Sequence, residues 1–452
     1  MFTEQERDSM QTACRRLGAN ELELAILGIF SASLLICIIS GYSILYALLA
    51  GYFIFSAYGL IKKFAISAIL KMSWTGIKTV KNILITFVLI GMITAVWRNC
   101  GTIPYIIYHS SKIIIPSVFI LITFLLCCLI SALTGTSFGS AATLGVICMT
   151  LAKTMGINVV FTGGAILSGI FFGDRCSFMS TSALLVSELT KTDIYVNVKN
   201  MVKTSIVPFI LSCAIYFVLG IKQNNPDFST EILNVFNDNF NLKLVVILPA
   251  LLIIVLCVFR VKVKIALILS IFASGLISIF VQNTSLAELV KLLLFGFQPQ
   301  DEKLYAMMNG GGIISMLRVM AIVCLSSCYA GIFEGTGLLN GLKSGIVWLS
   351  NKLTAYGALL FSSILTSMIS CNQTLSIMLT HYLCKDIIKD KEQLAVNLEN
   401  TVVVIAPLIP WSIAGAVPLA VTGAPVKSVL AAFYLFLLPL WNFAVQKFKT
   451  NP

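Results

Sequence analysis

The chain has 452 residues, of which 58% are hydrophobic and 11% are charged, and its mean hydropathy is +0.95. A soluble domain carries about 25% charged residues, so this composition excludes an ordinary soluble protein and indicates an integral membrane protein. Long unbroken apolar runs favour spanning α-helices over a β-barrel, whose strands alternate with a period of two. The net charge of +12 comes from Lys and Arg in short loops and at helix ends, and it predicts topology rather than nucleic-acid binding.

Taken in chain order, the apolar runs predict many helices, and several of these are too short to cross about 30 Å of hydrocarbon. The short runs near 141–190 and 373–423 predict half-helices or re-entrant arms. We expect an all-α polytopic membrane protein with about 10–13 transmembrane segments. The apolar segments are 22–41, 42–61, 82–98, 113–133, 141–152, 157–172, 181–190, 204–221, 242–259, 264–282, 313–333, 353–370, 373–384, 396–409, 414–423 and 427–446.

Charged loops predict which side of the membrane each segment faces. Loop 62–81 holds five Lys and no acid, so we expect it in the cytoplasm, where it could lie as an amphipathic segment. The basic turn 260–264 is also expected inside. The acidic loops 222–241 and 298–312 are expected outside.

Landmarks of the first half recur in the second half with opposite predicted orientation. The residues "NCGT" end at Thr102, and "FEGT" ends at Thr336; polar clusters follow after 35 and 36 residues, at Ser137 and Asn372. An inverted repeat is typical of a secondary transporter. We therefore expect the following division: N-terminal helices and a cytoplasmic amphipathic segment in 1–81, a first inverted repeat in 82–221, linking helices in 222–312, a second inverted repeat in 313–446, and a C-terminal tail in 447–452.

Polar interruptions mark the expected substrate site near the middle of the membrane. Four breaks, at 134–140, 173–180, 370–374 and 407–416, are rich in Gly, Ser, Thr, Asn or Pro. Free backbone groups at such breaks attract ions. Asp174 is the strongest candidate, because a charge at mid-bilayer costs at least about 2.5–3.5 kcal/mol and is usually paired or functional.

Several neutral side chains could complete this site. Asn372 could coordinate a cation or hydrogen-bond a solute, and it could equally cap a helix. Thr136, Ser137 and Thr374 are weaker candidates, because membrane Ser and Thr often bond only to their own helix. Glu399 could carry a proton or be an interfacial charge, and we expect it to begin a half-helix.

Signatures of other protein classes do not occur in the sequence. It has no G-x-S-x-G, Walker or H-E-x-x-H motif, so we expect no enzyme, no cofactor, and transport driven by an ion gradient. The thirteen Cys form no CxxC pair, and the two His are far apart, so a structural metal site is not expected.

Four ordered motifs resemble the NhaC-type sodium/proton antiporters, within the superfamily of inverted-repeat ion transporters. They are "GTIPYIIYHSSKIIIPSVF", "SALTGTSFGSAATLG", "GAILSGIFFGDRCS" and "APLIPWSIAGA", and the resemblance covers roughly residues 75–445.

The resemblance implies roles for particular residues. Gly135, Thr136 and Ser137 match the family's Gly-Thr-Ser, and Gly173 and Asp174 match its Gly-Asp. Arg175 stands where Lys is usual. The remaining matches are Ser177, Pro410, Trp411, Gly415 and Glu399.

This sequence also departs from the family pattern. Thr181, Asn372 and Asn400 stand where family members usually carry an acid, and Phe178 replaces an expected Pro. Three positions that carry a carboxylate in the family are therefore neutral here. Asp174 can still bind either Na⁺ or H⁺.

We predict a plasma-membrane antiporter that exchanges Na⁺ for H⁺ by alternating access. Asp174 would bind Na⁺ or a proton with Ser137, Thr136 and Asn372, supported by Ser177, Thr374, Glu399, Arg175 and Pro410. The alternative is a cation-coupled carrier of small organic solutes, such as malate, lactate or amino acids, with Asn372 and Arg175 at the solute headgroup. The expected partners are Na⁺, protons, the lipid bilayer and a second copy in a homodimer, without nucleic acid.

Overall fold

The computed structural model describes residues 23–450, except for 24, 31, 35, 38, 39, 41, 111–114, 179, 223–229, 260, 262, 337–353 and 371. Throughout this part the chain is helical, and its single β-bridge joins Phe297 to Gly310. The predicted all-α class is therefore confirmed. Residues 1–22 of the predicted N-terminal segment, and 451–452 of the predicted tail, lie outside the described residues.

The first half of the chain contains α2 to α12. Their bounds are α2 Ile44–Ile61, α3 Ile66–Thr79, α4 Lys81–Asn99, α5 Thr102–Ser110, α6 Pro116–Thr134, α7 Ser137–Ser140, a π-turn Ala141–Gly145, α8 Val146–Thr154, α9 Val159–Cys176, α10 Thr181–Thr190, α11 Ile194–Ile221 and α12 Thr230–Asn239.

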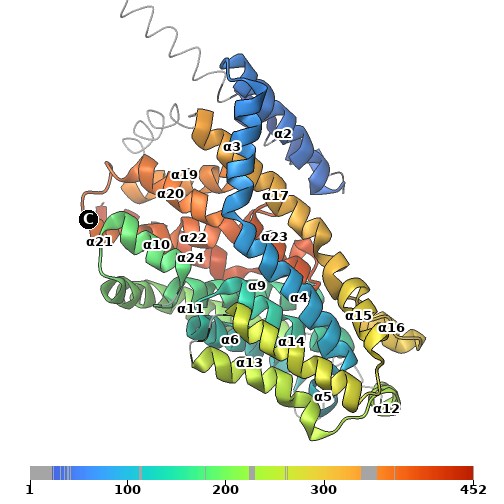
Figure 1. Ribbon diagram of the computed structural model, residues 1–452. Helices are drawn as coiled ribbons and strands as arrows, with labels where there is room; N and C mark the ends of the chain where they lie inside the picture. Colours follow the sequence, from blue (N-terminus) through green and yellow to red (C-terminus); the bar gives the residue numbers. More distant parts are fainter. Residues whose placement is uncertain are drawn as a thin grey trace, which may run out of the picture.

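The second half contains α13 to α24 (Figure 1). Their bounds are a 3₁₀ turn Leu244–Ile247, α13 Leu248–Val258, α14 Val263–Phe280, α15 Leu286–Phe295, α16 Glu302–Met308, α17 Gly312–Thr336, α19 Ala355–Ser370, α20 Gln373–Cys384, α21 Lys391–Asn400, α22 Val402–Ile405, a 3₁₀ turn Ala406–Leu408, α23 Ile413–Thr422, a 3₁₀ turn Val426–Ala431 and α24 Phe433–Thr450.

Within the described residues, four helices are long and apolar enough to cross a membrane, and the number rises to six if each of two bent pairs counts as one span. The bent pairs are Leu84–Asn99 with Thr102–His109, at 60°, and Lys391–Leu408 with Ile413–Thr422, at 53°. The described residues also contain shorter apolar helices, among them Lys264–Phe280 and Ala355–Ser370. The count of full-length spans leaves these helices out, and the expected number of 10–13 segments stays a prediction.

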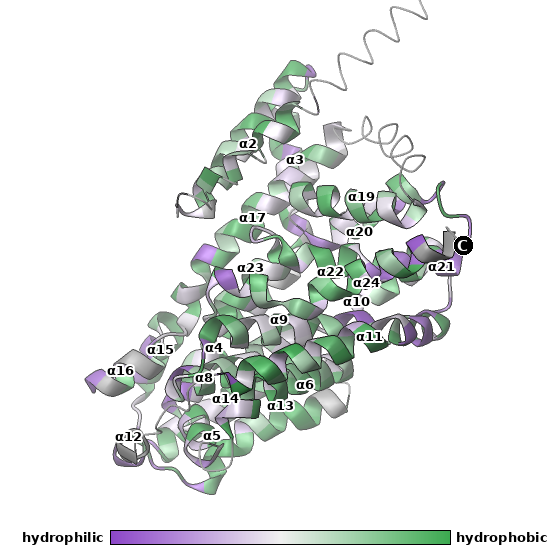
Figure 2. Cartoon of the chain, turned by 180° about the vertical axis from the view of Figure 1, so that it is seen from behind, coloured by the Kyte–Doolittle hydropathy of each residue, from purple (hydrophilic) through white to green (hydrophobic). Residues whose placement is uncertain are grey.

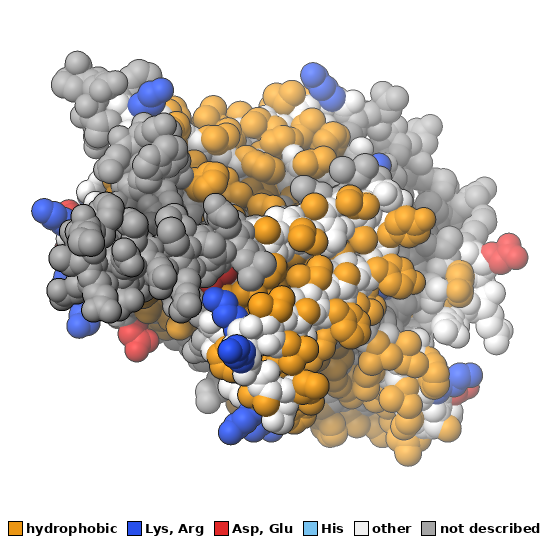
Figure 3. Space-filling model, turned by 90° about the horizontal axis from the view of Figure 1, so that it is seen from above, with side chains coloured by type: hydrophobic (Ala, Val, Ile, Leu, Met, Phe, Trp, Pro, Cys, Tyr) orange, Lys and Arg blue, Asp and Glu red, His pale blue; other side chains and the backbone are white. Residues whose placement is uncertain are grey.

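Apolar side chains cover much of the outer surface. Green, hydrophobic helices dominate the view in Figure 2, and hydrophobic atoms spread over the face seen in Figure 3. Phe272 and Phe280 of α14 are 66% and 78% exposed. An apolar exterior of this extent fits a protein surrounded by lipid.

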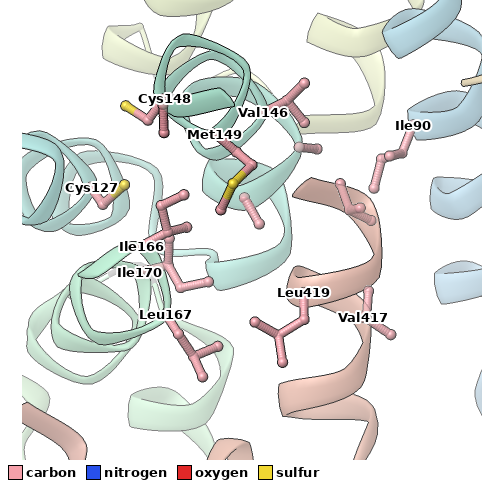
Figure 4. Close-up of a cluster of buried hydrophobic side chains, with 14 of the residues drawn as sticks. Ile90, Cys127, Val146, Cys148, Met149, Ile166, Leu167, Ile170, Val417 and Leu419 are labelled. Carbon is pink, nitrogen blue, oxygen red and sulfur yellow. The ribbon is translucent and has the colours of Figure 1, made fainter. Parts of the chain in front are cut away.

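Helix α9 lies at the centre of the fold (Figure 1). A Cβ atom built at Gly173 would lie 2.2 Å from the backbone N of Ala132, so α9 and α6 meet backbone to backbone. Figure 4 shows Ile166 and Ile170 of α9 beside Met149 of α8 and Leu419 of α23. This packing fixes the C-terminal end of α9 against the end of α6.

The Lys-rich segment 62–81, predicted to be amphipathic, forms helix α3, which packs on α17. A Cβ atom built at Gly76 would lie 1.9 Å from the carbonyl oxygen of Ser327, and one at Gly331 would lie 2.1 Å from that of Met72. Glycine on both helices therefore allows the two backbones to touch, so α3 has a protein partner.

Candidate functional site

The first predicted break separates α6 from α7. Gly135 ends α6 with φ 63°, a left-handed conformation that glycine adopts without strain. Thr136 then caps α7, because its Oγ1 accepts a hydrogen bond from the backbone N of Gly139 at 3.2 Å. Ser137 follows as the buried first residue of α7. The predicted interruption at 134–140 is therefore present.

Two hydroxyl groups form a hydrogen bond across this first break. The Oγ1 of Thr134 and the Oγ of Ser140 are 3.1 Å apart. Ser140 also donates to the carbonyl oxygen of Thr136 at 2.8 Å. The hydrogen bonds therefore join the last turn of α6 to the first turn after the break.

The second break, between α19 and α20, has the same construction. Asn372 caps α20, since its Oδ1 accepts a hydrogen bond from the backbone N of Thr374 at 2.9 Å. The Oγ atoms of Ser370 and Ser376 are 2.5 Å apart, and Ser376 donates to the carbonyl oxygen of Asn372 at 2.8 Å. Asn372 thus has the capping role that was its alternative interpretation. The equivalent residues, each pair separated by 236 positions, are Thr134 and Ser370, Thr136 and Asn372, and Ser140 and Ser376.

Asp174 lies in the last turn of α9, immediately before the break that leads to α10. Its carboxylate is buried, with 3% of the residue exposed. Ser180 donates to Oδ1 at 3.1 Å, and Ser182 donates to Oδ2 at 3.3 Å. Ser180 also caps α10. Each oxygen of the buried carboxylate therefore has a hydroxyl partner from the start of the next helix.

The second break contributes a neighbour to this carboxylate. Gln373, the first residue of α20, lies beside Asp174. Its Nε2 donates to the carbonyl oxygen of Val403 in α22 at 3.0 Å. The site thus brings together α9, α10, α20 and α22, which come from both predicted repeats.

Arg175 is fully buried and points to other partners than Asp174 does. Its Nε donates to the backbone oxygen of Glu399 at 3.2 Å, and Nη2 donates to the side chain of Asn400. Its remaining hydrogen bonds go to Cys176, Met201, Thr204, Ser205 and Tyr434. The guanidinium therefore ties α9 to α11, α21 and α24, and its hydrogen bonds are committed within the protein.

Glu399 is fully buried in the last turn of α21. The expectation that it begins a half-helix is wrong: the helix begins at Lys391, capped by Asp390, in a polar stretch that precedes the predicted apolar segment 396–409. Among the residues that the structure describes, neither oxygen of the Glu399 carboxylate has a hydrogen-bond partner. It does interact electrostatically with Asp174 and Arg175.

The other predicted site residues lie in or next to the helix breaks. Ser177 is buried in the break after α9, and Pro410 is half-buried in the turn before α23. Thr374 is exposed. Asn372 hydrogen-bonds to the backbone of its own break, and in the described part of the chain neither Asn372 nor Ser137 hydrogen-bonds to Asp174.

Sequence reasoning missed Ser180, Ser182 and Gln373 as neighbours of Asp174. The available signal was the run "STS" at 180–182, which follows Asp174 within one break and begins the next helix. Within the described ranges, no group of three or more His, Cys, Asp or Glu side chains could hold a metal ion.

Comparison with known proteins gives a consistent picture. The Na⁺/H⁺ antiporter family matches residues 169–443. The chain is 27% identical over 365 residues to the Na⁺/H⁺ antiporter NhaC of Alkalihalophilus pseudofirmus, with 78% of each chain covered. It is 25% identical over 374 residues to the malate-2H⁺/Na⁺-lactate antiporter of Bacillus subtilis, covering 80% of this chain and 79% of that one.

A third relative is named for amino-acid substrates. The arginine/ornithine antiporter ArcD of Halobacterium salinarum is 27% identical over 368 residues, with 77% of this chain and 75% of that one covered. The family match extends over more than half of the chain and contains Asp174, Arg175 and Glu399. The chain therefore belongs to the Na⁺/H⁺ antiporter family, and it is a multi-pass secondary transporter of the plasma membrane that exchanges Na⁺ for H⁺.

Proposed function

We propose that Asp174 is the group that binds Na⁺ and H⁺ alternately during this exchange. The observation that carries the proposal is a buried carboxylate whose two oxygens accept hydrogen bonds from Ser180 and Ser182 at a helix break. A carboxylate with neighbouring hydroxyl oxygens offers the hard ligands that Na⁺ requires. Protonation of the same carboxylate removes its charge and releases the cation.

The charged neighbour does not compete for this role. Arg175 donates to groups other than the Asp174 carboxylate, so the acid remains available to a mobile cation. Arg175 instead holds the end of α21 next to α9. We assign Ser177, Thr374 and Pro410 as supporting residues at three different breaks, those before α10, α20 and α23. Ser137, Thr136 and Asn372 hold helix starts.

Alternating access follows from the proposed repeats, 82–221 and 313–446. The matching hydrogen bonds at Thr136 and Asn372, 236 positions apart, support a common origin of the two breaks. In transporters with two such repeats, one repeat moves against the other around a fixed site. Residues 222–312 would link the repeats, and the N-terminal helices and the tail would flank them.

Exchange of an organic solute is the second candidate. Two relatives are named as a malate/lactate antiporter and an arginine/ornithine antiporter. Arg175 is a poor headgroup ligand, because its hydrogen bonds are already made to the protein. A solute would instead need the side-chain Nδ2 of Asn397 or Asn400, which has no hydrogen-bond partner among the described residues.

Proteoliposomes loaded with a pH-sensitive dye separate these two functions. We expect a Na⁺ pulse to move protons, and we expect external malate, lactate, arginine and ornithine to leave the dye signal unchanged. Counterflow of a labelled organic solute, together with no response to Na⁺, would reject the proposed Na⁺/H⁺ exchange in favour of the alternative. Empty liposomes and a K⁺ pulse serve as controls.

A further inference from the structure

The carboxylate of Glu399 has no function in the exchange described above. It is fully buried, and both of its oxygens lack hydrogen-bond partners in the described part of the chain. An ionised carboxylate in such a place costs several kcal/mol, because it has given up water without gaining donors. In the arrangement seen here, in which no donor contacts the carboxylate, the neutral, protonated form is therefore favoured.

The nearest cation does not satisfy this carboxylate. Arg175 reaches the backbone oxygen of Glu399 at 3.2 Å, and its other nitrogens bond to α11, α24 and Asn400. Among the described residues, no hydrogen bond joins the guanidinium of Arg175 to either carboxylate oxygen of Glu399. The guanidinium thus lies near Glu399 without forming an ion pair with its carboxylate.

Asp174 and Glu399 belong to the same buried region. The two acids interact electrostatically, and Arg175 lies next to Asp174 in sequence while holding Glu399 through its backbone. Asp174 differs in that Ser180 and Ser182 already supply oxygens beside its carboxylate. Only Asp174 therefore has the preformed set of oxygens that a Na⁺ ion needs.

The surroundings of Glu399 contain few other ionisable groups. Helix α21 packs against α10, α11, α19, α20, α22 and α24. Its acidic and basic neighbours on these helices are mostly at the surface: Glu188 of α10, Lys199 and Lys203 of α11, and Lys447 of α24 are exposed. The ionisable groups of the region are Asp174, Arg175 and Cys176 of α9, Tyr356 of α19, half-buried His381 of α20 and Tyr434 of α24.

From this geometry we propose that Glu399 is a second, proton-only site, so that two protons exchange for each Na⁺. The inference rests on the proposed function of Asp174. In the proton-loaded carrier both acids are neutral. When the site opens to water, both release their protons and Na⁺ binds at Asp174, while Glu399 keeps its charge beside Arg175. One net charge then crosses the membrane in each cycle, so the exchange rate depends on membrane potential.

The test compares wild-type protein with Glu399→Gln in proteoliposomes. Fluxes of radioactive Na⁺ and of protons are measured while valinomycin and K⁺ gradients set the membrane potential. The wild type should move two protons for each Na⁺ and respond to the potential. Glu399→Gln should still transport Na⁺, with the ratio reduced to one and the response to potential lost. Glu392→Gln, on the exposed first turn of the same helix, should behave like the wild type.

Each other result overturns a defined part of the account. A wild-type ratio of one, or a Glu399→Gln protein that transports Na⁺ with an unchanged ratio, would overturn the second site. Loss of Na⁺ exchange in folded Glu399→Gln would also overturn it, because Glu399 would then belong to the Na⁺ site. If Glu399→Gln does not fold, the proton-to-Na⁺ ratios of the wild type and of Glu399→Asp test the second site instead. No Na⁺-coupled proton movement in the wild type would instead reject the proposed function itself.

Discussion

Asp174 and Arg175 are neighbours in sequence but have different partners. The carboxylate accepts hydrogen bonds from Ser180 and Ser182, whereas the guanidinium bonds to α11, α21 and α24. Successive residues on a helix point in different directions, which keeps the two charges from neutralising each other. One residue can therefore serve transport while the other holds the surrounding helices.

Removing one of the two serine hydroxyls that hydrogen-bond to Asp174 should weaken Na⁺ binding. Ser182→Ala deletes the hydrogen bond to Oδ2 without removing the helix cap, which belongs to Ser180. A loss of about 1 kcal/mol raises the half-saturating Na⁺ concentration about fivefold. The concentration dependence of dye recovery measures this. Thr181→Ala, at the exposed position between the two serines, is the control. Equal half-saturation in the two variants would contradict the site.

Arg175 should matter more for stability than the surface arginines do. Arg175→Met leaves its neutral acceptors on α11, α21 and α24 unpartnered in the interior, and each such group costs about 1–3 kcal/mol. We expect a large fall in the melting temperature of the purified protein. Arg318→Met, at an exposed position, is the matched control. If both variants melt at the same temperature, the proposed tie between helices is wrong.

Part of the site could be predicted from residue types alone. A lone acid in an apolar run identified Asp174, because burial of a charge is costly whatever the fold. Which side chains contact Asp174 depends on the angles between helices at the breaks, and residue types alone do not predict these angles. Asn372 was therefore expected beside the ion, while Ser182, whose neighbours make it resemble an ordinary helical serine, was missed.

At the scale of elements, two glycines, Gly169 and Gly173, allow α9 to meet α6. A methyl group at Gly173 would lie 2.2 Å from the backbone N of Ala132, and no flexible side chain can yield there. Gly173→Ala should therefore lower stability by about 1–3 kcal/mol. Gly275→Ala in α14 is the control, since the nearest atom to its methyl group would be 3.6 Å away. A thermal melt compares the two variants, and equal melting would contradict the close packing.

Helix breaks were predicted better than helix starts. Gly and Pro clusters located the interruptions near 135 and 410, because these residues act locally on the backbone. The start of α21 at Lys391 lies in the polar stretch "KDKEQ", which precedes the predicted apolar segment 396–409. Only tertiary packing reveals that this stretch begins the helix that carries Glu399.

At the scale of the whole molecule, composition alone predicted a helical membrane protein, because 11% charged residues cannot cover a soluble surface. The number of spans was harder, because short helices and bent pairs divide the apolar runs differently. The exposed apolar side chains in Figure 3 suit lipid contact, and the homodimer stays a prediction.

The sidedness of the loops is open to direct measurement. The basic loop 62–81 should face the cytoplasm, and the acidic loop 298–312 should face outward. A membrane-impermeant maleimide should label Glu302→Cys in intact cells, and it should label Lys63→Cys only after permeabilisation. The unsubstituted chain gives the background from native cysteines. Labelling of both positions in intact cells would contradict the topology.

The central claim is that the Asp174 carboxylate exchanges Na⁺ for H⁺. The most direct test is Na⁺-driven dye recovery in proteoliposomes containing Asp174→Asn, a variant of nearly the same size that cannot lose a proton. We predict that dye recovery and Na⁺/Na⁺ exchange are both abolished while the protein stays folded. Full Na⁺-driven recovery in Asp174→Asn would contradict the account.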